Sequence, residues 1–240
     1  AVSLPDPATF RMSGAGGLIN INAPLTGTGD AQFGFVSSVT SFNADVTTAG
    51  GAIAVTGPLN LGAVTVATGG GVFSVSGTTT LTGDAAVDTA NGNVLFIGAV
   101  DGDDTANNRT LDVDAGTGTA EFRAATGVNG RLGSLASTAS TTSVVSVRTA
   151  GDQVYTGNLR TAGNLASQVA GDVTVTGLLT ITENVVISTA LAAGDNISLG
   201  AADVATGSAD KSLTLNAGLG TVALTGDAGV ANPFSTFAAT

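Results

Sequence analysis

Short runs of alternating apolar and polar residues, each closed by a glycine, recur along the chain. Examples begin at Ile53 (IAVTG), Phe73 (FSVSG) and Val173 (VTVTG). A period of two, β-branched neighbours and a closing turn residue are typical of short β-strands. No sustained apolar pattern at helical spacing accompanies these runs. We therefore expect an all-β protein with no significant helix.

The closing glycines return at a short, regular interval. Gly57 and Gly77 are 20 residues apart, and so are Gly157 and Gly177. This interval is too short for a βαβ unit, which takes roughly 30 residues. It suits one coil of a right-handed parallel β-solenoid (β-helix), with coils of about 20 residues stacked along one axis. About 12 such coils would form a rod roughly 55–60 Å long. A β-sandwich also has short strands, but it does not predict this interval.

A second, longer repeat organises the whole chain. The phrase LDVDAGTGTAEF at 111–122 returns as LTLNAGLGTVAL at 213–224, so that Gly118 corresponds to Gly220 at a separation of 102. A partial third copy lies at 10–21. If five coils of about 20 residues make one repeat, matched residues lie five coils apart and the two glycines occupy one turn position. The predicted organisation is an N-terminal extension or cap (1–9) and a single solenoid (10–240), made of a repeat tail (10–45), a full repeat (46–146) and a near-complete repeat (147–240).

Composition and charge exclude several functional classes. The 240 residues include 7 Lys and Arg against 18 Asp and Glu, a net charge of −11, so the chain lacks the cations that bind nucleic acid phosphates. Histidine and cysteine are absent, which excludes Ser-His and Cys-His catalysis and makes a zinc site untenable. No apolar run approaches the roughly 18 residues of a membrane span, and we expect the chain not to cross a membrane.

The most polar stretch is the candidate for metal binding. Asp101, Asp103 and Asp104, followed by Asn107 and Asn108, offer the hard oxygen ligands that calcium prefers. Their spacing matches neither the EF-hand loop nor the calcium-binding nonapeptide. We expect an exposed, solvated loop and assign no cofactor, with a calcium-stabilised structural module as one alternative. A polysaccharide-acting β-helix enzyme is the other alternative, since paired carboxylates could serve it. Most aspartates, however, stand at turns, and we name no catalytic residue.

Residues 132–159 contain sequence motifs that resemble those of a known family of repeat proteins. Leu132, Ser134 and Leu135 precede a phrase in which Gln153 and Tyr155 are prominent, within the sequence VRTAGDQVYTG. This stretch resembles the large secreted bacterial β-strand-repeat proteins of the filamentous-haemagglutinin and autotransporter-passenger type of adhesin. The first repeat departs from the pattern, with Ala52 and Val55 at those two places. The resemblance implies export and a role at the cell surface in attachment, aggregation or matrix assembly.

Taken together, these features predict a non-enzymatic, extracellular structural or adhesive rod of a bacterial surface or biofilm protein, with an unknown receptor. A coil without a neighbour exposes apolar side chains and unpaired backbone groups. Near the C-terminus, Phe234 and Phe237 stand without a charged neighbour. We therefore expect this end to associate either with another copy, so that the chains self-associate through the solenoid ends into filaments, or with a continuation of the chain. At the N-terminus we expect Pro5 and Pro7 to oppose the addition of a strand.

Overall fold

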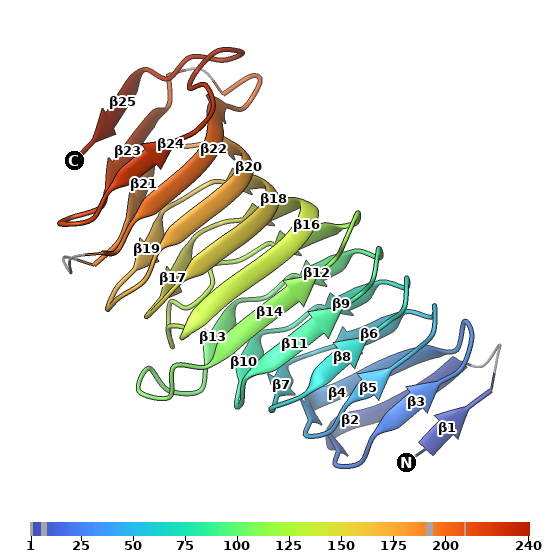
Figure 1. The fold of residues 1–240 in the computed structure, drawn as a ribbon. Coiled ribbons are helices and arrows are strands. Elements are labelled where there is room, and N and C mark those ends of the chain that lie inside the picture. The colour runs from blue at the N-terminus through green and yellow to red at the C-terminus, as the bar shows by residue number, and fades with distance from the viewer. Residues whose placement is uncertain (1, 6–8, 191–193, 209) are drawn as a thin grey trace.

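The computed structural model describes residues 2–5, 9–190, 194–208 and 210–240. Every regular element in these ranges is a β-strand, and every strand pairing is parallel. The chain winds about 10 turns of about 21 residues into a rod with the two termini at opposite ends (Figure 1). The predicted all-β solenoid is confirmed. The predicted 12 coils are too many, because some turns carry long corner loops. Val87, for example, pairs with Val113, 26 residues later.

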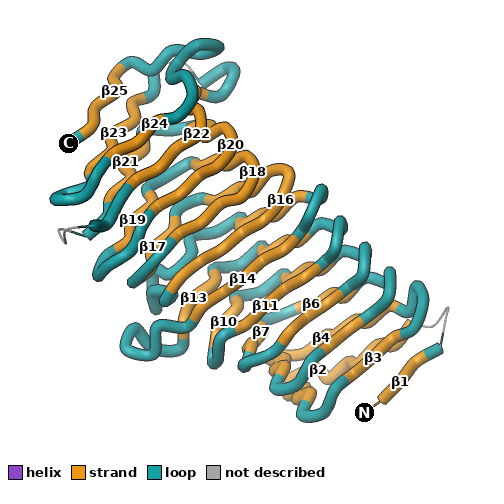
Figure 2. The backbone as a smooth tube through the Cα atoms, in the orientation of Figure 1, coloured by secondary structure: helices purple, strands orange, loops and turns teal. Residues whose placement is uncertain are grey.

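Each turn contributes to three parallel ladders of strands, which meet at corners formed by loops or by strands that bend (Figure 2). Ladder 1 faces the viewer in Figure 1. It consists of β1 (Val2–Leu4), β3 (Leu25–Gly27), β5 (Val46–Thr47), β8 (Thr65–Ala67), β11 (Ala85–Asp88), β14 (Thr110–Asp114), the first halves of β16 (Ser134–Val144), β18 (Gln153–Thr161), β20 (Val173–Ile181) and β22 (Ile197–Val204), and β24 (Val222–Leu224).

Ladder 2 follows ladder 1 in every turn. It consists of the first halves of β2 (Thr9–Ile21) and β4 (Gln32–Phe42), then β6 (Ile53–Thr56), β9 (Phe73–Val75), β12 (Val94–Phe96), β15 (Thr119–Phe122) and the second halves of β16, β18, β20 and β22.

Ladder 3 completes the turn. It consists of the second halves of β2 and β4, then β7 (Leu59–Leu61), β10 (Thr79–Leu81), β13 (Val100–Gly102), a single bridging residue at Thr126, β17 (Val147–Thr149), β19 (Leu165–Ser167), β21 (Val185–Ser188), β23 (Ser212–Asn216) and β25 (Thr236–Ala239). Strands that bend around a corner join ladders 1 and 2 and the first part of ladder 3 into one 20-stranded sheet, and β17 to β25 form a separate 5-stranded sheet.

The extension predicted at residues 1–9 contributes a strand. β1 pairs in parallel with β3, Val2 opposite Leu25, so the described part of this segment belongs to ladder 1. The proposed role of Pro7 falls outside the described residues and stays a prediction.

The long repeat does not advance by a whole number of turns. Leu111 lies on ladder 1, where it pairs with Leu135, whereas the matching Leu213 lies on ladder 3, where it pairs with Phe237. Phe10, from the partial copy, lies on ladder 2 opposite Phe33. From one copy to the next the chain passes four turns and two further strands, one strand short of five turns. The expectation of five coils per repeat was therefore wrong, and the three copies of one phrase occupy three different ladders.

The core is filled by side chains that point inward from all three ladders. In the first half of the rod it is rich in aromatic rings: those of Phe35 and Phe42 are 5.1 Å apart edge to face, and those of Phe96 and Phe122 stack at 5.2 Å. Such pairs add to the free energy of burial. Alternation along each strand explains the rest, because residues i and i+2 point to one side and the inward ones are Val, Ile, Leu and Phe.

A cluster of hydrogen-bonded polar side chains lies in the core where the two large repeats meet. The Tyr155 hydroxyl donates to Gln153 Oε1 at 3.1 Å, and Gln153 Nε2 donates to Thr149 Oγ1 at 3.2 Å. Ser137 and Thr142 bond each other at 2.8 Å nearby. All five are buried, and buried polar groups of this kind need partners. Burial raises the pKa of the Tyr155 phenol far above its ordinary value, so the phenol stays a donor.

Candidate functional site

The acidic loop after β13 holds its carboxylates in separate contacts. The Arg109 guanidinium donates to both oxygens of Asp103, at 3.0 and 3.1 Å, and Asn107 donates to Oδ1 at 3.2 Å. These bonds, the one from Arg109 above all, lower the pKa of Asp103 from 3.8 to about 2, and Asp103 raises the pKa of Arg109 in return. Asp103 is therefore already paired with a cation of the chain itself.

The other two candidate calcium ligands are also engaged elsewhere. Asp101 accepts from the backbone N–H and the side-chain amide of Asn129, in the next turn, at 3.1 and 3.0 Å. Asp104 Oδ1 accepts from the backbone N–H of Ala106 at 2.9 Å, within the loop. In the part of the chain that the structure describes, no group of three or more Asp, Glu, His or Cys residues could hold a metal ion. The predicted loop holds Asp103 and Asp104, but Asp101 lies in strand β13, and the three carboxylates do not converge on one point.

A larger pattern emerges when the remaining Asp and Asn residues are traced. Many accept a hydrogen bond from the backbone N–H that lies level with them in the following turn. Asp152 accepts from Asp172 at 2.9 Å, Asp172 from Asn196 at 2.6 Å, and Asn196 from Thr221 at 3.0 Å. Further acceptors of this kind are Asp45, Asp84, Asn91, Asn93, Asn158, Asn164 and Asn184.

We call this set the Asx ladder. The sequence held a signal for it, because an Asp or Asn often stands directly before the first inward residue of a strand, as in Asp45-Val46, Asp172-Val173 and Asn196-Ile197. Sequence reasoning placed most aspartates at turns, where Asp bonds its own backbone. That holds for Asp88 and Asp114, which accept from Ala90 and Gly116. For the aspartates of the ladder the expectation was wrong, since the acceptor serves the neighbouring turn.

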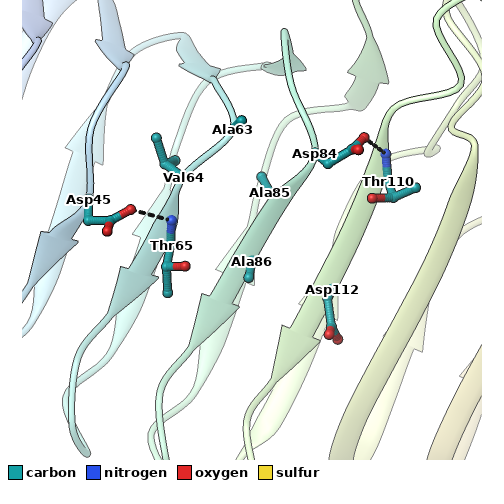
Figure 3. A pocket seen from close by; sticks show the side chains of 9 residues that line it. All are labelled: Asp45, Ala63, Val64, Thr65, Asp84, Ala85, Ala86, Thr110 and Asp112. Carbon is teal, nitrogen blue, oxygen red and sulfur yellow. Dashed lines mark hydrogen bonds between the residues drawn. The ribbon is translucent and has the colours of Figure 1, made fainter.

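An acidic hollow of the surface shows the same use of carboxylates (Figure 3). It lies on ladder 1, has a volume of about 360 Å³ and is lined by Asp45, Ala63, Val64, Thr65, Asp84, Ala85, Ala86, Thr110 and Asp112. Asp45 Oδ1 accepts from the Thr65 N–H at 2.8 Å, and Asp84 Oδ1 from the Thr110 N–H at 3.0 Å. The alanines between them make the hollow shallow. Two of its three carboxylates therefore bind backbone, which favours a stacking role over acid–base chemistry.

The edges of the last described turn are the second notable surface. β24 pairs with β22 and β25 pairs with β23, and on the other side of each no described strand pairs. Leu213 and Leu215 of β23 are buried, whereas Phe237, which lies level with Leu213, is 42% exposed. Asp227 is the single charged residue between 221 and 240. This end combines open backbone groups with apolar side chains, which is the arrangement that allows strand addition.

Comparison with protein-family models, with curated proteins and with solved structures finds no match to this chain. No helix among the described residues is long and apolar enough to cross a membrane.

Proposed function

We propose that this chain is a non-enzymatic structural rod of an extracellular bacterial surface or biofilm protein, serving attachment and associating through the ends of its solenoid. The observation that carries the proposal is the Asx ladder. Carboxylates and amides, the groups that could bind a ligand or transfer a proton, accept hydrogen bonds from the next turn instead. Such bonds satisfy backbone N–H groups at corners, which would otherwise destabilise the stack.

The resemblance at 132–159 supports the same kind of protein. Gln153 and Tyr155, prominent in that phrase, lie in the core, so the phrase specifies the packing of a solenoid rather than a ligand contact. Extracellular location and adhesion follow from the resemblance alone. A net charge of −11 fits a surface that stays apart from nucleic acids and from anionic lipid.

Sedimentation velocity over a range of concentrations, combined with negative-stain imaging, tests the rod and its association. We expect rods whose length grows in units of one chain as concentration rises. Phe237→Lys should reduce the association without unfolding the rod, because only the last turn changes. Compact particles, or identical monomers for both proteins at high concentration, would contradict the proposal.

A matched pair of assays addresses the two alternatives. Cleavage of acidic or neutral polysaccharides by the chain would favour the enzyme. A rise of several degrees in melting temperature on adding calcium, reversed by chelator, would favour the calcium module through mass action on the folded state. We expect neither, since Asp103 already pairs with Arg109.

A further inference from the structure

The segment 126–131 is the place where ladder 3 is thinnest. At this turn the ladder is reduced to the single residue Thr126, which bridges Val100 of β13 and Val147 of β17. Here ladder 3 also passes from the 20-stranded sheet, which contains β13, to the 5-stranded sheet, which begins with β17. Thr126 Oγ1 and Arg131 Nε are buried without a hydrogen-bond partner among the described residues. Few paired groups and unsatisfied polar atoms predict that local opening starts in this segment.

Asn129 joins this segment to the turn before it. Its backbone N–H donates to Asp101 Oδ1 at 3.1 Å, and its side-chain amide donates to Asp101 Oδ2 at 3.0 Å. Beside it, the Gly102 N–H donates to the Gly130 carbonyl at 2.7 Å. Each oxygen of the Asp101 carboxylate thus has one donor from residue 129. One of these two donors exists only while residue 129 carries an amide.

We propose that Asn129 is a site of spontaneous deamidation and that the reaction opens the rod at this segment. The residue after it, Gly130, has no side chain to hinder its backbone nitrogen. That nitrogen attacks Asn129 Cγ, so that an N–Cγ bond forms, the Cγ–Nδ2 bond breaks, and ammonia leaves with the proton of the Gly130 N–H. Water then adds to the succinimide ring and opens it to aspartate or isoaspartate. The reaction limits the lifetime of the rod whether or not chains associate through their ends.

The other Asn-Gly pair of the chain, Asn91 and Gly92, is held against the same reaction. The Gly92 N–H donates to the Thr89 carbonyl at 2.9 Å, which withholds the attacking nitrogen. Asn91 Oδ1 accepts from the backbone N–H and the hydroxyl of Thr117, at 3.1 and 2.8 Å. These bonds must break before the nitrogen can reach Cγ. Both Asn91 and Asn129 are exposed, so access of water does not separate the two sites.

At Asn129 the attacking nitrogen is not engaged. The Gly130 N–H donates to none of the described residues, and only the bond from Nδ2 to Asp101 holds the Asn129 side chain. The product places a second carboxylate opposite Asp101, where like charges repel each other. Isoaspartate also adds a methylene to the backbone. The contacts that join the segment to the preceding turn should therefore be lost.

Ageing of the purified chain at mildly alkaline pH, followed by tandem mass spectrometry, tests the site. Trypsin cleaves after Arg123 and Arg131 and releases residues 124–131, whose only side-chain amide is Asn129. Aspartate and isoaspartate should accumulate there at least about tenfold faster than at Asn91, because fewer hydrogen bonds break first. In concentrated urea the two rates should converge. Equal rates in the folded chain, or a difference that persists in urea, would overturn the inference.

Variants at the contact test the consequence for the rod, with circular dichroism as the check that each is folded. Asn129→Asp supplies the product directly, and hydrogen exchange at the Gly102 N–H should become about tenfold faster or more, since a bond to a charged group is lost. Asn91→Asp is the matched control and should leave exchange at Gly102 unchanged. Adding Asp101→Asn to Asn129→Asp exchanges the carboxylate and the amide, and should restore the protection. Unchanged exchange in Asn129→Asp, or no rescue in the double variant, would contradict the proposed opening.

Discussion

Residues 111–122 and 213–224 form the same strand, turn and strand on different ladders of one rod. In both, the N–H of the last turn glycine donates to the alanine carbonyl, from Gly118 to Ala115 at 2.7 Å and from Gly220 to Ala217 at 2.8 Å. In both, the residue before the alanine caps the turn, Asp114 in one and Asn216 in the other. The turn is therefore specified locally and fits any corner of the solenoid.

The two copies differ in their position along the rod. The later copy lies at the last described turn, where Leu224 is half-buried, whereas Phe122 of the earlier copy is 2% exposed with turns on both sides. In a quasi-one-dimensional fold, stability is a sum of units and their interfaces. Equal sequence should therefore give equal local geometry and unequal stability, and three pairs of substitutions and one single substitution test that statement.

The largest effect is expected at the two turn glycines. A Cβ at Gly118 would overlap the backbone of Gly92 in the turn below, and one at Gly220 would overlap the carbonyl of Asp195. Gly118→Val should lower the free energy of unfolding by about 3 kcal/mol or more, because neighbouring turns on both sides are displaced. Gly220→Val should detach only β24 and β25. Urea unfolding with hydrogen exchange measures both, and equal global losses would break the comparison.

A smaller difference is expected for the matched apolar residues. Phe122→Ala leaves a cavity beside the ring of Phe96 and should destabilise by about 3–5 kcal/mol. Leu224→Ala removes a half-buried side chain and should destabilise by about 1 kcal/mol. Thermal unfolding of the two variants decides the matter. The claim about depth fails if Leu224→Ala proves as severe as Phe122→Ala.

The tips of the two turns should tolerate exchange. Thr117 is exposed and donates to Asn91 Oδ1 at 2.8 Å, while Leu219 at the same place is 74% exposed. We expect Thr117→Leu and Leu219→Thr each to change stability by about 0.5 kcal/mol or less. A large loss in either, measured by urea unfolding, would mean that the tip and not the glycine specifies the turn.

The weakest effect is expected from the ion pairs of two matched cations. Arg109 pairs with Asp103 in its own loop, whereas Lys211, at the matching place, pairs with Glu183 of the preceding turn at 2.7 Å. The pKa of Asp103 is lowered from 3.8 to about 2. Its stabilisation is therefore complete above about pH 4 and disappears as the pH falls through about 2.

Asp103→Asn should remove that small part of the acid dependence, because an exposed pair contributes little. An NMR titration of the Asp103 carboxyl, together with melting curves of both proteins between pH 5 and 2, measures it. A carboxyl that titrates near 4 would show that the pair with Arg109 does not stabilise the Asp103 carboxylate.

The sequence predicted the β-solenoid but not the number of strands in one long repeat. Alternation and closing glycines report strands directly, and an interval of 20 residues reports a coil. A repeat of about 101 residues, however, fits either 14 or 15 strands, because corners vary in length. β16 bends from ladder 1 to ladder 2 without leaving the strand conformation, whereas the loop between β13 and β14 covers 103–109. Only the pairing register separates the two counts.

The candidate site was predictable in part for a related reason. The acidic stretch at 101–108 could be found because its residues are adjacent in sequence, although Asp101 proved to lie in strand β13 and not in the loop. The partners of Asp101 and Asp172 lie 28 and 24 residues away, in the next turn. Without a coil register, each of these residues looks like an ordinary turn aspartate. Likewise, Phe35 lies opposite Val55, and Tyr155 lies opposite Ser137. The large side chain is on the earlier strand in the first pair and on the later strand in the second, which could not be seen until the strands were paired.

The Asx ladder gives the rod a direction. In each member of this set the acceptor belongs to the earlier turn and the donor to the later one. Asp195, outside the set, accepts from Gly171 in the turn before. When the chain becomes available from its N-terminus onward, the Asp or Asn acceptor of one turn is thus in place before the backbone N–H of the next turn arrives. Each finished turn acts as a template for the next, and folding can proceed vectorially, without waiting for distant residues.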